Sequence, residues 1–515
     1  MDPERIEELK DPAIYPERSD SVIILQTHLS VVVLSGDSAY KFKKAIILPF
    51  ADFSSLEKRR FFCEEELRLN RRLCPEIYES VVELRRGESG KLQLGDSGEL
   101  LDYAVKMRRM PEERMMDVLL AENVVGADEI QVIARRVVAF HGVAERGPRV
   151  TASGDPEKLR DFALANFSET RGLFPAELHE ALAERTRRDL DRILPLLKSR
   201  AEAGLVVDGH GDLHARNICL IKPPAIFDCI EFNPAFRCVD VATEHAFLLM
   251  DLRHRGHPEL ARIYLDTVLA ESRDEGMKLV LPTLVRYRAM VRAKVSAITA
   301  GEKEFTPEAR AEAGEAAREY LRLAAVSAIE EDGPWWLIFC GLPASGKSSI
   351  AHSLVQASRE AWSVFSTDHI RKELAGVPPT EILPPQYYSD EFSRRTYGEV
   401  RVRAAADTKA NSVVILDANF RGRGERALAL AAARAAGARL VILHIETDER
   451  TVIERLNQRK SDPRSESDAD REVYEKLKSQ FEAPQAYEAD LLLSVSGDPS
   501  PDIAADEIIC SLLGA

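Results

Sequence analysis

The chain has 515 residues, which is too long for one hydrophobic core and corresponds to about three structural units at roughly 150 residues each. Its 70 basic and 85 acidic residues give a formal net charge of −15 at pH 7. This balance argues against a protein that coats nucleic acid, because such binding depends on Lys and Arg neutralising phosphates. A hydrophobic content of 45% and a charged content of 30% exclude a disordered or fibrous chain.

Membrane and disulfide classes are not expected either. No stretch approaches the roughly 20 apolar residues that cross a bilayer, and the start MDPERIEELK lacks an apolar signal core. The seven cysteines are scattered and form no C-x-x-C pair, so neither a disulfide framework nor a zinc site is predicted. We therefore expect a cytoplasmic protein without a membrane partner and without extended nucleic-acid binding.

Strand patterns dominate the chain between residues 21 and 47, in SVIILQT, VVVLSG and AYKFKKAII. A charged amphipathic helix is predicted over residues 56–73, and a strand returns at 101–107. From about residue 112 to 205 the pattern is mostly helical. These features predict a small, mainly β lobe over about 20–110, followed by a helical lobe over about 111–305.

A helical linker is predicted next. Thr306 followed by Pro307 has the pattern of an N-cap and first helical position, and Gly333-Pro334 ends the helix. We therefore expect a linker over 306–330 and a domain boundary near residue 331. Strands are then expected at 335–340, 364–367, 412–417, 439–446 and 490–494. Because they alternate with helices, one of which begins at Lys347, they predict a parallel sheet.

One motif for phosphate chemistry lies in VVDGHGDLHARNICL. Here His210 and Asp212 are followed by Asn217, and AIFDCIEFN adds Asp228 eleven residues later. This is the H-x-D-x-x-x-x-N pattern with a later strand-end aspartate that is typical of kinases. Asp212 would accept the proton of the attacking hydroxyl, and Asn217 and Asp228 would supply oxygen ligands to Mg²⁺.

A kinase site of this type also needs a lysine in an early strand and a glutamate in the following helix. AYKFKK offers Lys41 and Lys43 on the same strand face. FFCEEELRLNRRL offers Glu66, with Glu64 and Glu65 as alternatives.

With these residues, about 20 to 300 of the chain resemble the aminoglycoside phosphotransferase and choline-kinase-like family, in its bacterial branch fused to a P-loop domain. HGDLHxxN is that family's form of the motif, and VDVA places Asp240 at its recurring D-x-A. The resemblance implies that Lys41 contacts the phosphates of ATP and that Glu66 pairs with Lys41. Lys41 is preferred over Lys43 because Ala39-Tyr40-Lys41 has the family's A-x-K pattern.

Two features depart from this family. QTHLS stands in place of a glycine-rich loop, and CIEFN instead of FG follows the metal aspartate. Glu231 within CIEFN is interpreted either as a second metal ligand or as a solvated carboxylate.

A second, unrelated motif is FCGLPASGKSSI, which has the form G-x-x-x-x-G-K-[ST] between a strand pattern and a helix pattern. Its backbone N–H groups and the N-terminus of the following helix would surround phosphate oxygens. Lys347 would reach the β and γ phosphates, and Ser348 would ligate Mg²⁺. The predicted nucleotide-binding residues are Gly341, Ala344, Ser345, Gly346, Lys347, Ser348 and Ser349.

Further polar residues follow the later strands of this region. They are Asp368 and Arg371 in STDHIR, Asp417 in VVILDANF, and Arg455 and Arg459 in TVIERLNQRK. Taken singly, Asp368 could be a helix N-cap, and the last two arginines could be surface charges.

Together they resemble the small P-loop kinases, a group that includes gluconate kinase, polynucleotide kinase and zeta-toxin-like kinases, over about residues 335 to 500. The resemblance implies that Asp368 is the acceptor-side base and Arg371 a substrate ligand. It also implies that Arg455 and Arg459 bind phosphates, and that Asp417 helps to hold Mg²⁺ or contacts the substrate.

The predicted fold is thus an α+β, kinase-like, two-lobed domain over 1–330, followed by a three-layer α/β P-loop domain with a parallel sheet over 331–515. The predicted function is a tandem phosphotransferase that uses ATP and Mg²⁺ and acts on hydroxyls of sugars, amino-sugars or nucleosides. Two alternatives stay open: a nucleic-acid 5′-hydroxyl kinase in the P-loop domain, and one domain that binds nucleotide only to regulate the other.

Overall fold

The computed structural model describes residues 3–17, 19–302, 305–408, 413–459, 470–498 and 500–515. The chain forms two compact units. Unit 1 comprises Met1–Phe162 and Leu190–Arg288, and unit 2 comprises Ala163–Asp189 and Ala289–Ala515. The predicted division into domains 1–330 and 331–515 remains a prediction. Within the described ranges, no helix combines the length and the apolar character that crossing a membrane requires.

Unit 1 begins with an antiparallel sheet whose strand order is β1-β2-β3-β8-β6-β7. The strands are β1 (Val22–Gln26), β2 (Ser30–Ser35), β3 (Ser38–Lys43), β6 (Tyr78–Arg86), β7 (Leu92–Leu94) and β8 (Glu99–Arg108). The strands predicted in 21–47 and at 101–107 are confirmed. β6 was not predicted, because its sequence YESVVELRR carries charged residues on a half-exposed strand and so lacks a clear apolar pattern.

The two faces of this sheet have different partners. Tyr40 and Phe42 of β3 pack in one core with the N-terminal residues Leu9 and Tyr15. Because side chains alternate along a strand, Lys41 and Lys43 point to the opposite face, where α2 (Leu56–Asn70) lies. The alternation thus directs both lysines toward the glutamates of α2.

Helices make up most of the remainder of unit 1, and some of them extend into the sequence ranges of unit 2. The helices are α1 (Pro3–Glu8), α3 (Met116–Ala121), α4 (Ala127–Val143), α5 (Pro148–Ser153), α6 (Pro156–Glu169), α7 (Ala176–Glu202), α8 (Pro234–Arg237), α9 (Val241–His254), α10 (Pro258–Ser272) and α11 (Leu281–Gly301). The short strand pairs are β4 (Ile47–Leu48) with β5 (Ala51–Asp52), β9 (Val206–Asp208) with β12 (Cys238–Asp240), and β10 (Ile218–Cys219) with β11 (Ala225–Ile226). The last two pairs flank the loops that carry the first motif.

Unit 2 contains a parallel sheet with the strand order β14-β15-β13-β16-β17. Its strands are β13 (Trp335–Cys340), β14 (Ser363–Ser366), β15 (Val413–Asp417), β16 (Arg439–Glu446) and β17 (Leu491–Ser496). The predicted parallel sheet is confirmed, and each predicted strand lies within a few residues of its observed position. Long apolar runs such as WWLIFC are typical of strands buried on both faces.

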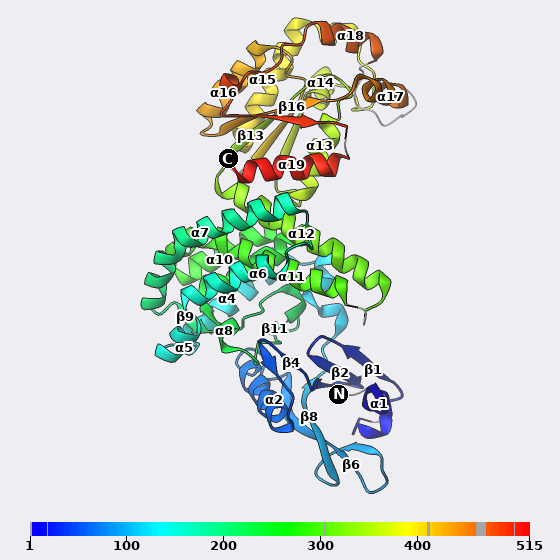
Figure 1. Cartoon of the computed structure of the whole chain (residues 1–515), viewed down its shortest axis with the longest axis vertical. Coiled ribbons are helices and arrows are strands. Elements are labelled where there is room, and N and C mark those ends of the chain that lie inside the picture. Colours follow the sequence, from blue (N-terminus) through cyan, green and yellow to red (C-terminus); the bar gives the residue numbers. More distant parts are fainter. Residues whose placement is uncertain (1–2, 18, 303–304, 409–412, 460–469, 499) are drawn as a thin grey trace. The chain divides into compact units, whose positions relative to one another are not determined.

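Helices cover both faces of this sheet (Figure 1). α13 (Lys347–Ala357) and α19 (Pro501–Leu513) lie on one face, and α15 (Asp390–Asp407) and α16 (Arg423–Ala435) lie on the other. α12 (Pro307–Glu331) packs against α13 and α19, and its N-cap is Thr306, as predicted. The remaining helices are α14 (Thr367–Ala375), α17 (Glu449–Arg459) and α18 (Arg471–Ser479).

Candidate functional site

Lys41 of unit 1 contacts carboxylates from two distant parts of the sequence. Its Nζ lies 2.8 Å from Glu66 Oε1 on α2 and 2.5 Å from Asp228 Oδ1, which is 187 residues away along the chain. Burial alone would lower the pKa of Lys41, but the charges of Asp228 and Glu66 raise it well above its usual value. Lys41 is therefore a fixed cation at the point where the sheet, α2 and the Asp228 loop meet.

Lys43 lies beside it and contacts the same glutamate. Its Nζ is 2.7 Å from Glu66 Oε2 and also pairs with Glu231. Glu231 is only 7% exposed, so it is not the solvated carboxylate that was one of the two interpretations from sequence. It is the buried counter-ion of Lys43 instead, and burial raises its pKa.

Glu66 is the residue of α2 that faces both lysines. Burial alone would raise its pKa, but Lys41 and Lys43 lower it to about 2. The sequence alternatives Glu64 and Glu65 form ion pairs on the surface of α2 with Arg60 and Arg68. The sequence could not separate these three glutamates, because the choice depends on which one faces β3.

Asp212 and Asn217 lie together in the loop after β9. Asn217 Nδ2 donates hydrogen bonds of 3.0 Å to the carbonyl oxygen and to Oδ2 of Asp212. The Asp212 N–H donates to His210 Nδ1 at 3.2 Å, so His210 Nε2 carries the ring proton and donates to the Phe227 carbonyl at 2.8 Å. His210 thus ties the Asp212 loop to the residue that precedes Asp228.

Asp228 has an unusual backbone conformation. Its φ of +62° lies in the left-handed region, which Asp tolerates better than most residues. Its side chain is 42% exposed, so a ligand can reach it. Asp228 and Asn217 offer the hard oxygen donors that Mg²⁺ prefers when it is held together with substrate phosphates. Within the described ranges, no group of three or more His, Cys, Asp or Glu side chains converges on a metal-sized space.

Glu244 of α9 is a residue of this site that the sequence analysis did not identify. It is 1% exposed, accepts the N–H groups of His210 at 2.9 Å and Gly211 at 2.5 Å, and lies 3.2 Å from His141 Nε2. Burial alone would raise the pKa of Glu244, but His141, His210 and the Gly211 N–H lower it to about 2. A carboxylate in the mostly apolar stretch VATEHAFLLM was the available signal.

The surroundings of Glu244 explain two other features of the sequence. A Cβ at position 209 would come 2.8 Å from Glu244 Cδ, so a larger residue there would displace the Glu244 carboxylate from its hydrogen bonds. Asp240 of the D-x-A pattern caps α9 by accepting the Ala242 N–H and pairs with Arg200 through two 2.8 Å contacts. Asp240 therefore fixes the start of the helix that carries Glu244.

The P-loop of unit 2 lies between β13 and α13, as predicted. Gly346 has a φ of +99° and Ala344 a φ of +60°, so the loop turns through left-handed positions before the helix begins. Lys347 Nζ lies across the loop and donates to the Leu342 carbonyl at 2.6 Å. A Cβ at Gly341 would come 2.8 Å from the Ile445 carbonyl oxygen, so this glycine is required by close packing. Ser345 is buried, whereas Ser348 and Ser349 are exposed in the first turn of α13.

Arg455 of α17 reaches this loop. Its Nη2 donates to the Gly497 carbonyl at 2.8 Å, and its Nη1 would lie 3.2 Å from a Cβ built on Gly346. That Nη1 is buried and has no hydrogen-bond partner in the part of the chain that the structure describes. An unsatisfied buried donor beside a P-loop fits an oxygen of a bound phosphate. The side chain of Arg459 lies outside the described residues.

Asp368 and Arg371 lie on α14, next to the end of β15. Ser366 caps this helix by accepting the Asp368 N–H, so the alternative interpretation of Asp368 as the N-cap is wrong. Arg371 Nη1 donates to the Tyr387 carbonyl at 2.8 Å and to Ser393 Oγ at 3.3 Å. Asp417 is the last residue of β15 and is 8% exposed.

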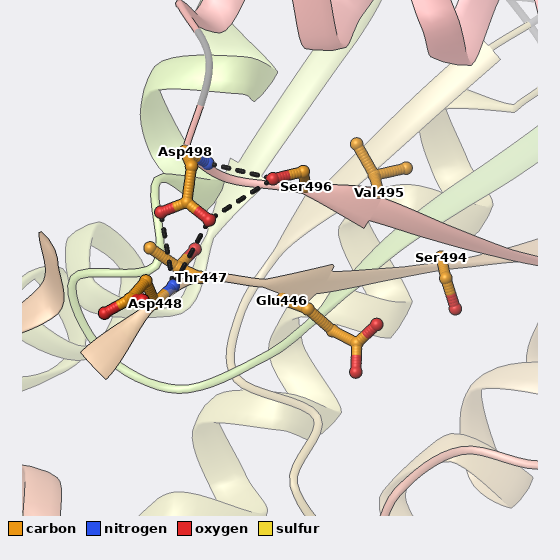
Figure 2. A pocket seen from close by; sticks show the side chains of 7 residues that line it. All are labelled: Glu446, Thr447, Asp448, Ser494, Val495, Ser496 and Asp498. Atoms are coloured by element: carbon orange, nitrogen blue, oxygen red, sulfur yellow. Dashed lines mark hydrogen bonds between the residues drawn. The ribbon is translucent and has the colours of Figure 1, made fainter. Parts of the chain in front are cut away.

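A hollow of about 350 Å³ opens at the carboxyl ends of β16 and β17 (Figure 2). It is lined by Glu446, Thr447, Asp448, Ser494, Val495, Ser496 and Asp498. Thr447 Oγ1 donates to the Ser345 carbonyl at 2.8 Å, which links the hollow to the P-loop. Ligands of parallel α/β sheets bind at this edge. None of these residues was predicted from sequence.

One family model matches the part of the chain that contains the P-loop. Residues 337–484 match the AAA domain family. Over 409 residues the chain is 29% identical to proteins described as uncharacterized from Mycobacterium tuberculosis strain H37Rv and from Mycobacterium bovis. These alignments cover 77% of this chain and 78% of each relative.

Three solved structures show lower similarity. An amicoumacin kinase in complex with AMP-PNP, Ca²⁺ and its ligand has a TM-score of 0.38 at 12% identity and covers 62% of this chain and 96% of its own. The APS kinase of Mycobacterium tuberculosis with AMPPNP and APS has a TM-score of 0.27 at 21% identity, covering 36% and 99%. A gluconokinase from Sinorhizobium meliloti has a TM-score of 0.26 at 17% identity, covering 35% and 92%.

Proposed function

We propose that the protein is an ATP-dependent phosphotransferase with one active site in each unit. Each site would transfer the γ-phosphoryl group of Mg-ATP to a hydroxyl of a small polar acceptor of the sugar, amino-sugar or nucleoside class. The observation that carries the proposal is the contact of Lys41 with both Glu66 and Asp228, residues that come from separate elements. We also propose that residues 20–300 are related to the aminoglycoside phosphotransferases, which they resemble in sequence.

In unit 1, Asp212 is proposed to accept the proton of the acceptor hydroxyl. Asn217 donates to Asp212 Oδ2 and so orients that carboxylate. Lys41 would pair with the nucleotide phosphates while Glu66 holds it in place. Asn217 and Asp228 would hold Mg²⁺, which neutralises charge on the phosphates when it is bound.

In unit 2, the P-loop N–H groups and the first turn of α13 would surround the phosphates. Lys347 would leave the Leu342 carbonyl for the β and γ phosphates, and the unsatisfied Nη1 of Arg455 would stabilise the transferring group. Asp368 would act as the base and Arg371 would hold the acceptor. Ser348 and Asp417 would hold Mg²⁺.

Phosphate transfer by each unit can be tested separately in the full chain. ATP consumption is measured across a library of hydroxyl-bearing metabolites for the wild type, Asp212→Asn, Lys347→Ala and the double variant. We expect each single variant to lose a different set of acceptors, with Asp212→Asn reducing its own set by about 10²–10⁴-fold because proton transfer is removed.

Two exposed residues serve as matched controls. Asp161→Asn and Lys478→Ala change the same residue types at the surface and should leave both sets unchanged. A wild-type protein that consumes no ATP with any acceptor would refute the proposal. If one single variant loses activity toward both sets of acceptors, the unit that carries the substitution would instead regulate the other unit.

A further inference from the structure

The segment from Asp417, the last residue of β15, to Phe420 meets the P-loop directly. The Gly341 N–H donates to the Asn419 carbonyl at 3.1 Å. Phe420, next along the chain, is fully buried and has a φ of +41°, in the left-handed region. For a bulky residue this conformation is strained, and such strain persists only where the surrounding structure enforces it.

Three side chains hold the backbone of Phe420. Arg426 Nη1 donates to its carbonyl at 2.8 Å, and Cys340 Sγ donates to the same oxygen at 3.4 Å. The Phe420 N–H donates to Tyr397 Oη at 3.4 Å. Cys340 immediately precedes the P-loop. Its contact with Phe420 therefore joins the P-loop to the Asp417–Phe420 segment.

Arg426 is completely buried on α16 and is neutralised by Glu488. Its Nε donates to Glu488 Oε2 at 2.7 Å and its Nη2 to Glu488 Oε1 at 3.3 Å. Buried ion pairs contribute little net stability, because the cost of desolvation offsets their attraction. The pair is therefore better explained by the position it imposes on Phe420 than by stability.

We propose that Arg426 is a positioning residue for phosphoryl transfer in unit 2. Through the Phe420 carbonyl it holds the Asp417–Phe420 segment against the P-loop, which keeps the Asp417 carboxylate at the bound nucleotide. Arg426 acts through Phe420 and does not contact the reacting groups. The inference rests on the proposed function of unit 2.

The test uses the full chain and three variants. Arg426→Met combined with Glu488→Met removes the pair without leaving an unpaired buried charge. Arg426→Lys keeps the charge beside Glu488 but lacks the forked donors. Arg434→Met is the matched control, because Arg434 is an exposed arginine of the same helix with a surface partner, Asp490. The measurements are hydrogen exchange of the segments 337–346 and 413–421, ATP affinity by calorimetry, and the rate of ATP consumption.

We expect the double variant to exchange at least tenfold faster in both segments, to bind ATP within threefold of wild type, and to turn over at least tenfold more slowly. Arg426→Lys should fall between the double variant and wild type, and it decides the question if the double variant does not fold. If a folded double variant keeps the wild-type rate of hydrogen exchange or of ATP turnover, the inference about Arg426 is wrong, while the proposed function of unit 2 still stands. Absence of ATP consumption by the wild type would refute the proposed function, and the inference with it.

Discussion

Lys41 and Lys43 contact the same glutamate but differ in exposure, at 14% and 1% of the side chain. Lys41→Met should reduce phosphate transfer by unit 1 by about 10²-fold or more, because it removes a cation at the phosphates. Lys43→Met should instead lower the free energy of unfolding of unit 1 by about 3–5 kcal/mol, because Glu231 is left buried without its counter-ion. Initial rates and hydrogen exchange of unit 1 measure the two effects. If the Lys43→Met variant is stable but inactive, Lys43 and not Lys41 would be the lysine that acts on the phosphates.

Substitution of Lys347 and substitution of Asp368 should impair phosphate transfer by unit 2 in different ways. Lys347→Ala should weaken phosphate stabilisation whatever the acceptor is. Asp368→Ala should leave ATP affinity nearly unchanged while the transfer rate falls, because only interactions made in the transition state change the chemical step alone. Calorimetry with ATP beside transfer rates separates the two. If Asp368→Ala abolishes ATP binding, Asp368 serves the nucleotide or the fold.

Glu244 should make unit 1 sensitive to acid. Its pKa is lowered from 4.5 to about 2 in the folded state, so it stabilises the fold fully above pH 4.5 and loses this contribution as the pH falls toward 2. The shift corresponds to about 3 kcal/mol. Hydrogen exchange of the segment 206–219 at pH 7 and pH 3.5 measures the effect. Wild type should lose protection at pH 3.5, once the intrinsic pH dependence of exchange is subtracted, and Glu244→Gln should show a smaller change. An equal loss in both proteins would assign the acid sensitivity to another group.

The helix α12 belongs to the core of unit 2. Its residues Tyr320, Leu323 and Ile329 are buried, and Arg322 pairs with Asp506 of α19 at 2.8 Å. The Trp335 indole N–H donates to the Ile329 carbonyl at 3.0 Å. The helix therefore does more than connect two domains.

A fragment of residues 331–515 should consequently be much less stable than one of residues 305–515. Each buried Leu or Ile side chain of α12 contributes about 1.5–3 kcal/mol when it is removed from water. Urea titrations followed by tryptophan fluorescence compare the two fragments, which both lack residues 163–189. Equal midpoints would mean that α12 is only a linker.

The tryptophans of the chain report on unit 2 alone. Trp335, Trp336 and Trp362 are the only tryptophans of the sequence, and all three are buried in unit 2. Saturation with ATP at 100 times its Kd should stabilise unit 2 by about 2.7 kcal/mol and shift the fluorescence transition. Lys347→Ala should abolish this shift and Asp228→Ala should retain it. Loss of the shift in Asp228→Ala would contradict independent nucleotide sites.

The features that depend on short stretches of chain follow from the amino-acid sequence alone. The start of α12 follows from Thr306 and Pro307, and the parallel sheet follows from buried runs such as Trp335–Cys340. The turn of the P-loop follows from Gly346, whose backbone is left-handed, within the local pattern G-x-x-x-x-G-K-[ST]. In each case the cause lies within a few residues of the effect.

Which polar side chains are partners depends instead on the folded arrangement of the chain. Glu66 rather than Glu64 or Glu65 faces the lysines, Glu231 neutralises Lys43, and Glu244 holds the backbone of His210 and Gly211. Phe420 is held in its left-handed conformation by Arg426, whose own charge is neutralised by Glu488. These partners lie far apart in the sequence or differ from their neighbours only in the direction they face. Burial removes water as an alternative partner, so folding alone determines which charges must meet.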